Sequence, residues 1–365
     1  MRLFLFIIAM SKVNLNDYVC AVPFTSLEIM EKQRHLCCSS WLLNPLPEKS
    51  SVKDAWFSKQ ANDVRDSVLD GTFQYCSKTQ CPVLNQLVTK GPVGKIDPIY
   101  RKDTLPTDLL KKIELYKNDI LYPTIVQFSF DRSCNLKCPS CRVSIITASS
   151  KKISEVELTI QEIENTFGKY IETLYITGSG DPFISVGFRN FMHNLDSKKW
   201  PRLKNIHLHT NATKWNKKWW KYIEPAHKYI RSCEISIDAA TKDTYENKTR
   251  IGGNWEELIN NLKFISTLPK LKRIKTSFVV QQANYTEMQD FYNMMIDIFK
   301  NKAEVFFGRI NNWGTFSDEE FFEHKVWDKA HPEHQLFVDE VNKVIPAKQC
   351  WHNLQDFVYT AKSVI

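Results

Sequence analysis

The sequence predicts an α/β protein whose main part contains a parallel β-sheet, preceded by a small cysteine-rich segment. Short apolar runs alternate with helical stretches over residues 125–310, as expected for strand–helix–strand units with right-handed crossovers. Three cysteines follow the first apolar run, and five more lie upstream, within residues 20–81. The alternation is compatible with either a doubly wound sheet or a barrel.

Composition and charge narrow the class of protein. The chain has 365 residues, of which 43% are hydrophobic, and a formal net charge of +8. Its length alone suggests about two to three domains. Because lysine is spread along the chain, the charge fits a solvated surface, and nucleic acid is not an expected partner. Ten cysteines that fall mainly into two groups indicate metal ligands in a reducing, cytoplasmic location, and not a disulfide framework.

The N-terminus contains a short apolar run, MRLFLFIIAM, within its first ten residues. No small-residue cleavage site follows it, and no run in the chain is long enough to span a bilayer. We therefore expect neither a signal peptide nor a membrane contact, and Met10 is an alternative start.

Six strand-like runs and the segments between them predict the order of elements. The runs cover residues 125–130, 173–178, 204–210, 233–238, 275–281 and 303–310, with amphipathic helices expected over 155–170 and 255–268. Upstream, residues 24–41 suit two short strands, and a helix should end at Gly71. The expected boundaries are an N-terminal extension (1–17), a cysteine-rich domain (18–89), a linker (90–117), a core (118–315) and a helical tail (316–365).

The central motif is DRSCNLKCPSC, in which Cys134, Cys138 and Cys141 have the spacing C-x3-C-x2-C. Three thiolates in one loop can hold one metal centre. A structural zinc site needs four ligands, and this loop offers no fourth cysteine or histidine. A cuboidal 4Fe-4S cluster has four irons, so three cysteines would leave one iron open to a substrate or a cofactor.

The upstream cysteines form a second candidate metal centre. Cys20, one of the adjacent pair Cys37 and Cys38, Cys76 and Cys81 make a set of four thiolates. Successive residues of a strand face opposite sides, so Cys37 and Cys38 cannot easily bind the same centre. Spacing alone leaves both a zinc-stapled small domain and an iron–sulfur site open.

Polar residues follow the expected strands where the loops begin. The segment GSGDP at residues 178–182 follows the second run, and its glycines allow the backbone to approach a ligand. The third and fourth runs each place polar side chains on one face: His207, His209, Asn211, Glu234, Ser236 and Asp238. We expect these faces to point into a barrel interior, where the strand ends carry the chemistry.

Together, these features resemble the radical S-adenosylmethionine (radical SAM) enzymes. The resemblance rests on DRSCNLKCPSC, GSGDP, SIDAATKDTY with the following RIGGNW, and the upstream cysteine-rich segment. More narrowly, the chain resembles members with a twitch (SPASM-like) auxiliary-cluster domain, here N-terminal to the core. The resemblance covers about residues 18 to 315. It implies a partial (β/α)6 TIM-like barrel preceded by a small cysteine-rich α+β twitch domain.

The same resemblance implies two iron–sulfur clusters and a cofactor site. Cys134, Cys138 and Cys141 would hold a catalytic 4Fe-4S cluster whose open iron binds S-adenosylmethionine. An auxiliary 4Fe-4S cluster would be held by Cys20, Cys37, Cys76 and Cys81, with Cys38 as the substitute for Cys37. The implied cofactor contacts are Gly178, Ser179, Gly180, Asp181, Asn211, Ser236, Asp238, Arg250 and Gln281. Two positions differ from the family pattern, because Asp181 replaces a glutamate and Ser140 an aromatic residue.

The implied reaction is reductive cleavage of S-adenosylmethionine to a 5′-deoxyadenosyl radical, which abstracts hydrogen from a substrate. A peptide or protein side chain is the preferred substrate class, small molecules remain open, and a flavodoxin or ferredoxin would be the reducing partner. Cys350 is a candidate hydrogen donor, although a buried thiol explains it more simply. The alternative hypothesis is a non-catalytic iron–sulfur or zinc-stapled binding module that retains the fold.

Overall fold

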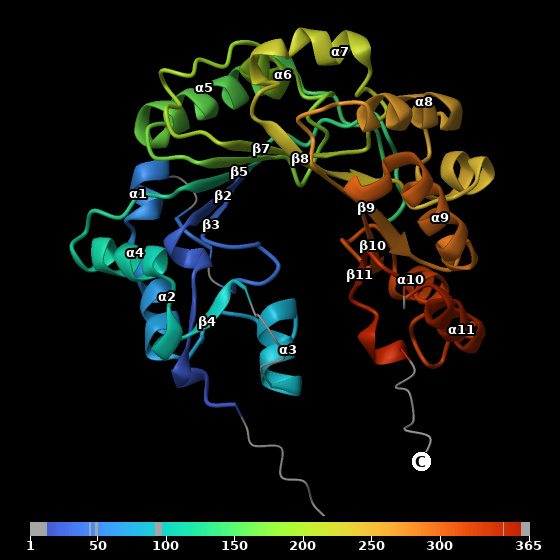
Figure 1. The fold of residues 1–365 in the computed structure, drawn as a ribbon, viewed down its shortest axis with the longest axis horizontal. Coiled ribbons are helices and arrows are strands. Elements are labelled where there is room, and N and C mark those ends of the chain that lie inside the picture. Colours follow the sequence, from blue (N-terminus) through green and yellow to red (C-terminus); the bar gives the residue numbers. More distant parts are fainter. Residues whose placement is uncertain (1–12, 44, 48–49, 92–96, 346, 359–365) are drawn as a thin grey trace, which may run out of the picture. The chain divides into compact units, whose positions relative to one another are not determined.

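The computed structural model describes residues 13–43, 45–47, 50–91, 97–345 and 347–358. The chain divides into two compact units, Met1–Val126 and Gln127–Ile365, whose elements are labelled in Figure 1. Among the described residues, no helix is long and apolar enough to cross a membrane. The alternative start at Met10 and most of the expected N-terminal extension lie outside the described residues.

The first unit contains two small pairs of antiparallel strands. β1 (Tyr18–Cys20) pairs with β4 (Ile99–Arg101), and β2 (Ser26–Met30) pairs with β3 (Arg34–His35). β2 and β3 confirm the two short strands expected within residues 24–41.

Four helices complete the first unit: α1 (Val52–Trp56), α2 (Lys59–Asp70), α3 (Pro82–Lys90) and α4 (Thr107–Lys117). The expected end of α2 is confirmed at Gly71, whose φ of 88° is a left-handed conformation that glycine adopts without steric strain.

The segment expected as a linker, residues 90–117, belongs largely to the first unit. It contains β4, which pairs with β1, and α4, whose Leu109 and Ile113 are buried. The sequence did not predict β4, because this strand has only three residues and its hydrogen-bonding partner lies far upstream in the chain.

The second unit is organised around one sheet. The strands in spatial order are β5 (Ile125–Ser129), β6 (Thr173–Ile176), β7 (Asn205–Thr210), β8 (Ile230–Ser236), β9 (Arg273–Val280), β10 (Ala303–Arg309) and β11 (Cys350–His352). The strands from β6 to β11 pair in parallel. The expected α/β fold with a parallel sheet is therefore confirmed, and the tail adds one strand, β11, that was not expected.

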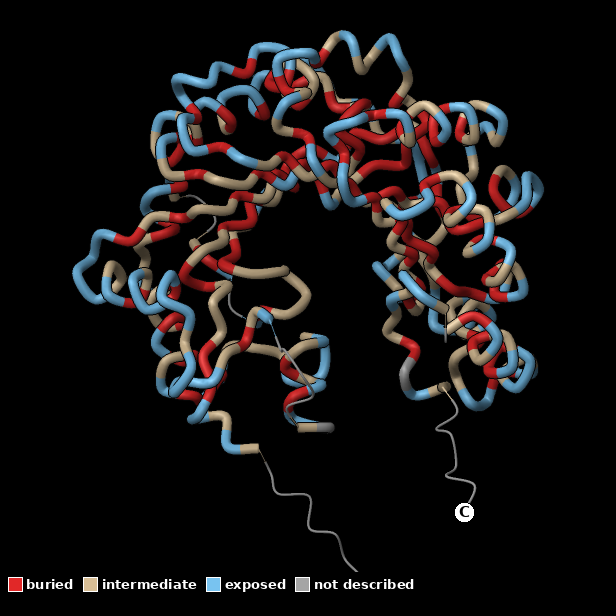
Figure 2. The backbone as a smooth tube through the Cα atoms, in the orientation of Figure 1, coloured by how far each residue is buried: buried red, intermediate tan, exposed pale blue. Residues whose placement is uncertain are grey.

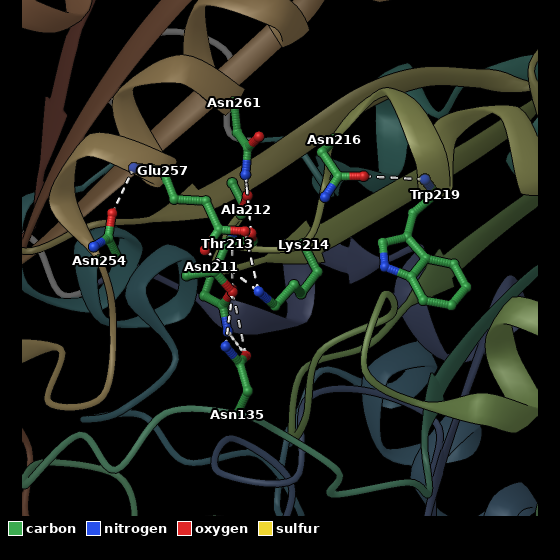
Figure 3. Close-up of polar contacts among 10 residues, drawn as sticks. All are labelled: Asn135, Asn211, Ala212, Thr213, Lys214, Asn216, Trp219, Asn254, Glu257 and Asn261. Atoms are coloured by element: carbon green, nitrogen blue, oxygen red, sulfur yellow. Dashed lines mark hydrogen bonds and ion pairs between the residues drawn. The ribbon is translucent and has the colours of Figure 1, made fainter.

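Helices connect these strands and lie on the outer side of them (Figure 1). They are α5 (Ser150–Phe167), α6 (Val186–His193), α7 (Lys217–Tyr222), α8 (Trp255–Ser266), α9 (Met288–Phe299), α10 (Asp318–His324) and α11 (His334–Val344). Asparagine side chains cap two of them, because Asn216 accepts from Trp219 N–H and Asn254 accepts from Glu257 N–H (Figure 3).

The two faces of the sheet differ in polarity. In β7, Ile206 and Leu208 are fully buried, whereas His207 and His209 on the other face are half-buried. Figure 2 shows buried positions along the strands of this unit and exposed positions on the outer surfaces of its helices. The polar face expected from the sequence is thus the face away from the helices.

Candidate metal and cofactor site

The three-cysteine loop follows β5 and is fixed at several points. Cys134 N–H and C=O both bond to the backbone of Ile146, and Lys137 N–H donates to Ile251 O at 2.8 Å. Cys134 and Cys138 are buried and Cys141 is exposed. The loop therefore presents its thiols from a defined backbone conformation.

A buried carboxylate anchors the start of this loop. Asp131 Oδ1 accepts from the backbone N–H and the hydroxyl of Ser133, at 2.9 and 2.7 Å, and Oδ2 accepts from the Ser185 hydroxyl. These bonds connect the loop to the N-terminus of α6. Sequence reasoning missed Asp131 because an aspartate that begins a loop has the same local pattern whether it is buried or solvated.

Each of the three thiols accepts a hydrogen bond from a different side chain. The pairs are Asn211 Nδ2 to Cys134 Sγ (3.6 Å), Arg250 Nη1 to Cys138 Sγ (3.6 Å) and Arg142 Nη2 to Cys141 Sγ (3.4 Å). The donors come from the end of β7, from the segment after β8 and from the cysteine loop itself. Hydrogen bonds to cysteine sulfur are typical of iron–sulfur sites, where they tune the cluster.

The thiols are arranged differently from the ligands of a single ion. Among the described residues, no three Cys, His, Asp or Glu side chains are placed to hold one metal ion. A cuboidal cluster makes a different demand, because each cysteine binds a separate iron.

Burial controls the protonation of the two inner thiols. It raises the pKa of Cys134 to about 11, with Asp181 acting in the same direction and Arg142 against it. Burial also raises the pKa of Cys138, while Arg250 lowers it. Binding of a metal centre would displace both protons, since the thiolate is the ligand form.

The GSGD segment after β6 packs directly against the cysteine loop. Asp181 N–H donates to Ser133 O at 2.8 Å, and Arg142 Nη2 donates to Ser179 O at 2.8 Å. The structure thus brings together the two motifs that the sequence placed after neighbouring strands.

Gly180→Ala is expected to lower the free energy of unfolding by about 1–3 kcal/mol, as overpacking does. A Cβ at this position would lie 2.4 Å from Asp131 O and 2.8 Å from Ser133 O, and both are backbone atoms of the cysteine loop. Gly178→Ala is the matched control, because its nearest neighbour, Gln127 Nε2 at 2.9 Å, ends a side chain that can rotate away. Equal effects of the two substitutions in urea denaturation would contradict this interpretation.

The Asp181 carboxylate points into the protein. It is 1% exposed and accepts from Phe183 N–H (2.9 Å), the Thr210 hydroxyl (2.7 Å) and Asn211 N–H (2.8 Å). A carboxylate engaged by three protein donors connects the ends of β6 and β7, and this structure shows it as a positioning residue. The cofactor contact that the resemblance implied for Asp181 stays a prediction.

Asparagines fix the segment after β7 (Figure 3). Asn211 Nδ2 donates to Asn135 Oδ1 at 3.1 Å, and Asn135 Nδ2 donates to Thr213 Oγ1 at 3.0 Å. Asn261 Nδ2 donates to the carbonyls of Ala212 and Thr213, each at 2.9 Å. The Asn211 amide is therefore held towards the cysteine loop by bonds at both ends of its segment.

Asp238 and Arg250 form a buried ion pair beside Cys138. Arg250 Nη2 lies 2.6 Å from Asp238 Oδ2, with the side chains 11% and 2% exposed. Asp238 has a φ of 61°, and its Oδ1 accepts from Val279 N–H at 2.8 Å. Burial would lower the pKa of Arg250, but Asp238 and the Cys138 thiol raise it above its ordinary value.

Two buried polar atoms next to this pair have no hydrogen-bond partner within the described part of the chain. They are Arg250 Nε and the Tyr245 hydroxyl, and both residues interact electrostatically with Cys138. Buried polar groups are almost always satisfied, so two unsatisfied atoms at one place fit a further polar group bound there. The residues present are therefore compatible with a cluster and its cofactor.

The other two expected cofactor contacts lie near the ends of β8 and β9. Ser236 Oγ is 3.1 Å from His209 Nε2, and Gln281 is buried, with its N–H donating to Asn284 Oδ1. Within the described structure, neither makes a hydrogen bond to the cysteine loop.

A charged cluster occupies the polar face of β7 to β9. Glu234 accepts from Lys275 Nζ at 3.0 Å and from the Ser277 hydroxyl. Burial by itself would raise the pKa of Glu234, but His209 and Lys275 hold it at about 2. Lys275 is a residue of this face that sequence reasoning did not select.

Cys350 lies on the opposite face from this charged cluster. It pairs in register with Val305 of β10, which is buried under the helices, whereas Lys275 pairs with Glu304. Burial raises the pKa of Cys350 to about 11. The register places Cys350 on the same face as the apolar Val305, as the simpler explanation of a buried thiol expects. A role as hydrogen donor stays a prediction.

The first unit contains five free thiols, and several of them influence one another's pKa. Burial raises the pKa of Cys20 to about 12, and Cys76 and Cys81 add to the increase. Burial likewise raises the pKa of Cys37, with the Cys20, Cys38 and Cys81 thiols adding to it. Cys20, Cys37, Cys76 and Cys81 form one set within these five. These four are the thiols expected to hold the auxiliary centre.

Cys38 has different neighbours from Cys37. After burial, the groups that act on the pKa of Cys38 are the backbone of Ser40, the carboxylate of Glu28 and the backbone of Trp41. The Cys38 thiol nevertheless contributes to the raised pKa of Cys37. The choice of Cys37 over Cys38 as the ligand therefore stays a prediction.

Comparisons with known proteins give similar folds at low identity. No family model matches the sequence, and no curated protein matches it. Similar solved structures include Streptococcus suis SuiB bound to S-adenosylmethionine, with 16% identity and a TM-score of 0.44 over 70% of this chain and 56% of that chain. SuiB bound to its precursor peptide SuiA has 14% identity and a TM-score of 0.42, over 80% and 62% of the two chains.

A radical SAM methyltransferase from Sphaerobacter thermophilus is a further similar structure, with 12% identity and a TM-score of 0.31 over 49% of this chain and 54% of that chain. The structural neighbours of this chain therefore include radical SAM enzymes. This chain spans less than two thirds of the SuiB chains, and TM-scores below 0.5 assign it neither an activity nor a substrate.

Proposed function

We propose that the protein is a radical SAM enzyme whose second unit, a partial (β/α)6 TIM-like barrel, binds a 4Fe-4S cluster through Cys134, Cys138 and Cys141. The observation that carries this proposal is the three-cysteine loop after β5, in which every thiol accepts a hydrogen bond from a separate side chain. The unsatisfied Arg250 Nε and Tyr245 hydroxyl support a further polar group beside Cys138.

The chain's own residues would hold and shield this centre. When bound, the cluster and S-adenosylmethionine would supply a 5′-deoxyadenosyl radical for hydrogen abstraction. Three thiolates leave one iron open for the cofactor. Asp181 and Asp238 hold the segments that carry the thiol donors Asn211 and Arg250. Gly180 permits the close packing of the GSGD segment on the cysteine loop.

Anaerobic reconstitution followed by reduction with dithionite tests the proposal. We expect about eight irons per chain if both clusters are cuboidal, and 5′-deoxyadenosine on addition of S-adenosylmethionine. A fully reconstituted protein that forms no 5′-deoxyadenosine would favour the non-catalytic binding module. Tightly bound zinc without iron would refute the cluster itself.

The first unit would be the twitch-type domain and hold the auxiliary 4Fe-4S cluster through Cys20, Cys37, Cys76 and Cys81. The mutual influence of these thiols on their pKa values supports the grouping. With four protein ligands this cluster has no open iron, so its role would be electron transfer.

Cys37→Ala is expected to remove about four of the eight irons that two cuboidal clusters contain, whereas Cys38→Ala should retain them all. Burial and the thiols of Cys20, Cys38 and Cys81 raise the pKa of Cys37, whereas after burial the groups that act most on the pKa of Cys38 are Ser40 and Glu28. Iron and sulfide analysis after anaerobic reconstitution distinguishes the two. The reverse result would assign Cys38 as the ligand.

A peptide or protein side chain is the proposed substrate class, and a flavodoxin or ferredoxin the proposed electron donor. The polar face of the sheet offers hydrogen-bonding groups to such a substrate, notably His209, Glu234 and Lys275. Turnover assays with short synthetic peptides, followed by mass spectrometry, test this class. Turnover of a small molecule but of no peptide would exclude it.

A further inference from the structure

Arg142 is a buried guanidinium with no carboxylate partner among the described residues. It is 7% exposed. Its Nη1 donates to Arg132 O at 2.8 Å, and its Nη2 donates to Ser179 O at 2.8 Å and to Cys141 Sγ at 3.4 Å. Two of these acceptors are neutral carbonyls and the third is a thiol, so no bond to Arg142 balances its charge.

Arg250 provides the contrast within the same site. It also donates to a cysteine sulfur, but the Asp238 carboxylate at 2.6 Å balances its charge. A buried charge without a counter-charge is strongly unfavourable. Of the three acceptors of the Arg142 guanidinium, only Cys141 Sγ, at 3.4 Å from Nη2, can carry a negative charge. The missing counter-charge is therefore expected on the cysteine loop.

We infer that Arg142 compensates the charge of the cluster proposed above and sets its reduction potential. This inference rests on the proposed function. One-electron reduction by an external donor adds a negative charge to a centre that already carries three thiolates. A fixed cation beside Cys141 stabilises the reduced state more than the oxidised state, because the attraction grows with the charge. Net charge and hydrogen bonds to sulfur are two of the factors that set such potentials.

Two features make Arg142 suited to this role. Its guanidinium is held from both sides by the carbonyls of Arg132 and Ser179, so the N–H donor cannot turn away from the sulfur. An arginine also keeps its proton at any physiological pH, so the cation persists whether or not the cysteines are ionised.

Redox titration of full-length protein tests the inference. Wild type, Arg142→Gln, Arg142→Lys and Arg189→Gln are reconstituted anaerobically and titrated with mediators. Electron paramagnetic resonance measures the amount of reduced cluster. The signal that changes when S-adenosylmethionine is added is the one followed, because it identifies the cluster of the three-cysteine loop. We expect about tenfold less reduced centre in Arg142→Gln at a fixed potential, which is about 59 mV for a one-electron couple. Arg142→Lys, which keeps the charge, should recover most of this difference.

Arg189 is the matched control, because its guanidinium also donates to backbone carbonyls. Its guanidinium donates to the carbonyls of Phe183 and Ile184 and stacks on Trp219, without contact to a thiol. Arg189→Gln should therefore titrate as wild type does. An unchanged potential in Arg142→Gln, or an equal shift in Arg189→Gln, would overturn the inference.

Arg142→Gln could fail to assemble the centre whose signal responds to S-adenosylmethionine. In that case the Arg142→Lys variant decides between the two explanations. Assembly with a potential near wild type in the lysine variant would support the role of the charge, whereas no assembly in either variant would overturn a role in setting the potential. Wild-type protein that takes up no iron would refute the proposed function itself. The two kinds of failure are thus distinguishable.

Discussion

Cys138→Ala is expected to abolish 5′-deoxyadenosine formation while about half of the bound iron remains. Cys138 is buried and accepts from Arg250, so its loss would remove a proposed cluster ligand from the interior of the three-cysteine loop. A cuboidal cluster left with two cysteines should not survive reconstitution, whereas the cysteines of the first unit are unaffected. Iron and sulfide analysis measures the bound iron that remains. Chromatography of the reaction mixture measures the formation of 5′-deoxyadenosine.

Cys233→Ala is the matched control, since Cys233 is a buried cysteine of β8 outside both cysteine groups. It should retain all the iron and the activity. Loss of all iron in Cys138→Ala would contradict the independence of the two centres. Full activity in the same variant would contradict the assignment of the catalytic loop.

Asp238→Asn is expected to lower the free energy of unfolding by about 3–5 kcal/mol, because removal of one partner leaves Arg250 as an uncompensated buried charge. Asparagine tolerates the left-handed φ of 61° about as well as aspartate does, so the change tests the charge and not the backbone. Urea denaturation of the metal-free proteins measures the difference in free energy of unfolding between wild type and Asp238→Asn.

Glu304→Gln serves as the comparison for this ion pair. Glu304 pairs with Arg273 at 2.8 Å, but the Arg273 side chain is 72% exposed. Exposed ion pairs contribute at most about 1 kcal/mol, so this substitution should have a small effect. If Glu304→Gln lowered the free energy of unfolding as much as Asp238→Asn does, burial would not distinguish the two ion pairs.

Much of the fold could be predicted because the relevant patterns are local. The strand runs that became β5 to β10 are recognised by apolar residues in short stretches, and α2 by its helical periodicity and its terminal Gly71. β4 and β11 escaped prediction because three residues are too few to show a period. β4 pairs with β1, which is distant in the sequence. β11 pairs with β10, from which the helices α10 and α11 separate it in the sequence.

The candidate site was predictable only in part, for a related reason. Cys134, Cys138 and Cys141 are visible as a spacing, but an arginine next to a cysteine has the same local pattern whether it is buried or solvated. Arg142 could therefore not be selected. The local motif around Asp181 likewise did not reveal that its carboxylate accepts hydrogen bonds from Phe183, Thr210 and Asn211.

By itself, the sequence determined the order of the strands β5 to β10, the three-thiol loop and the existence of a second cysteine group, because periodicity and ligand spacing are properties of neighbouring residues. Only the tertiary structure decided which donors surround each thiol of the loop, and that the guanidinium beside Cys141 has no carboxylate partner among the described residues. These features depend on segments that meet only when the sheet has formed, so no local pattern records them.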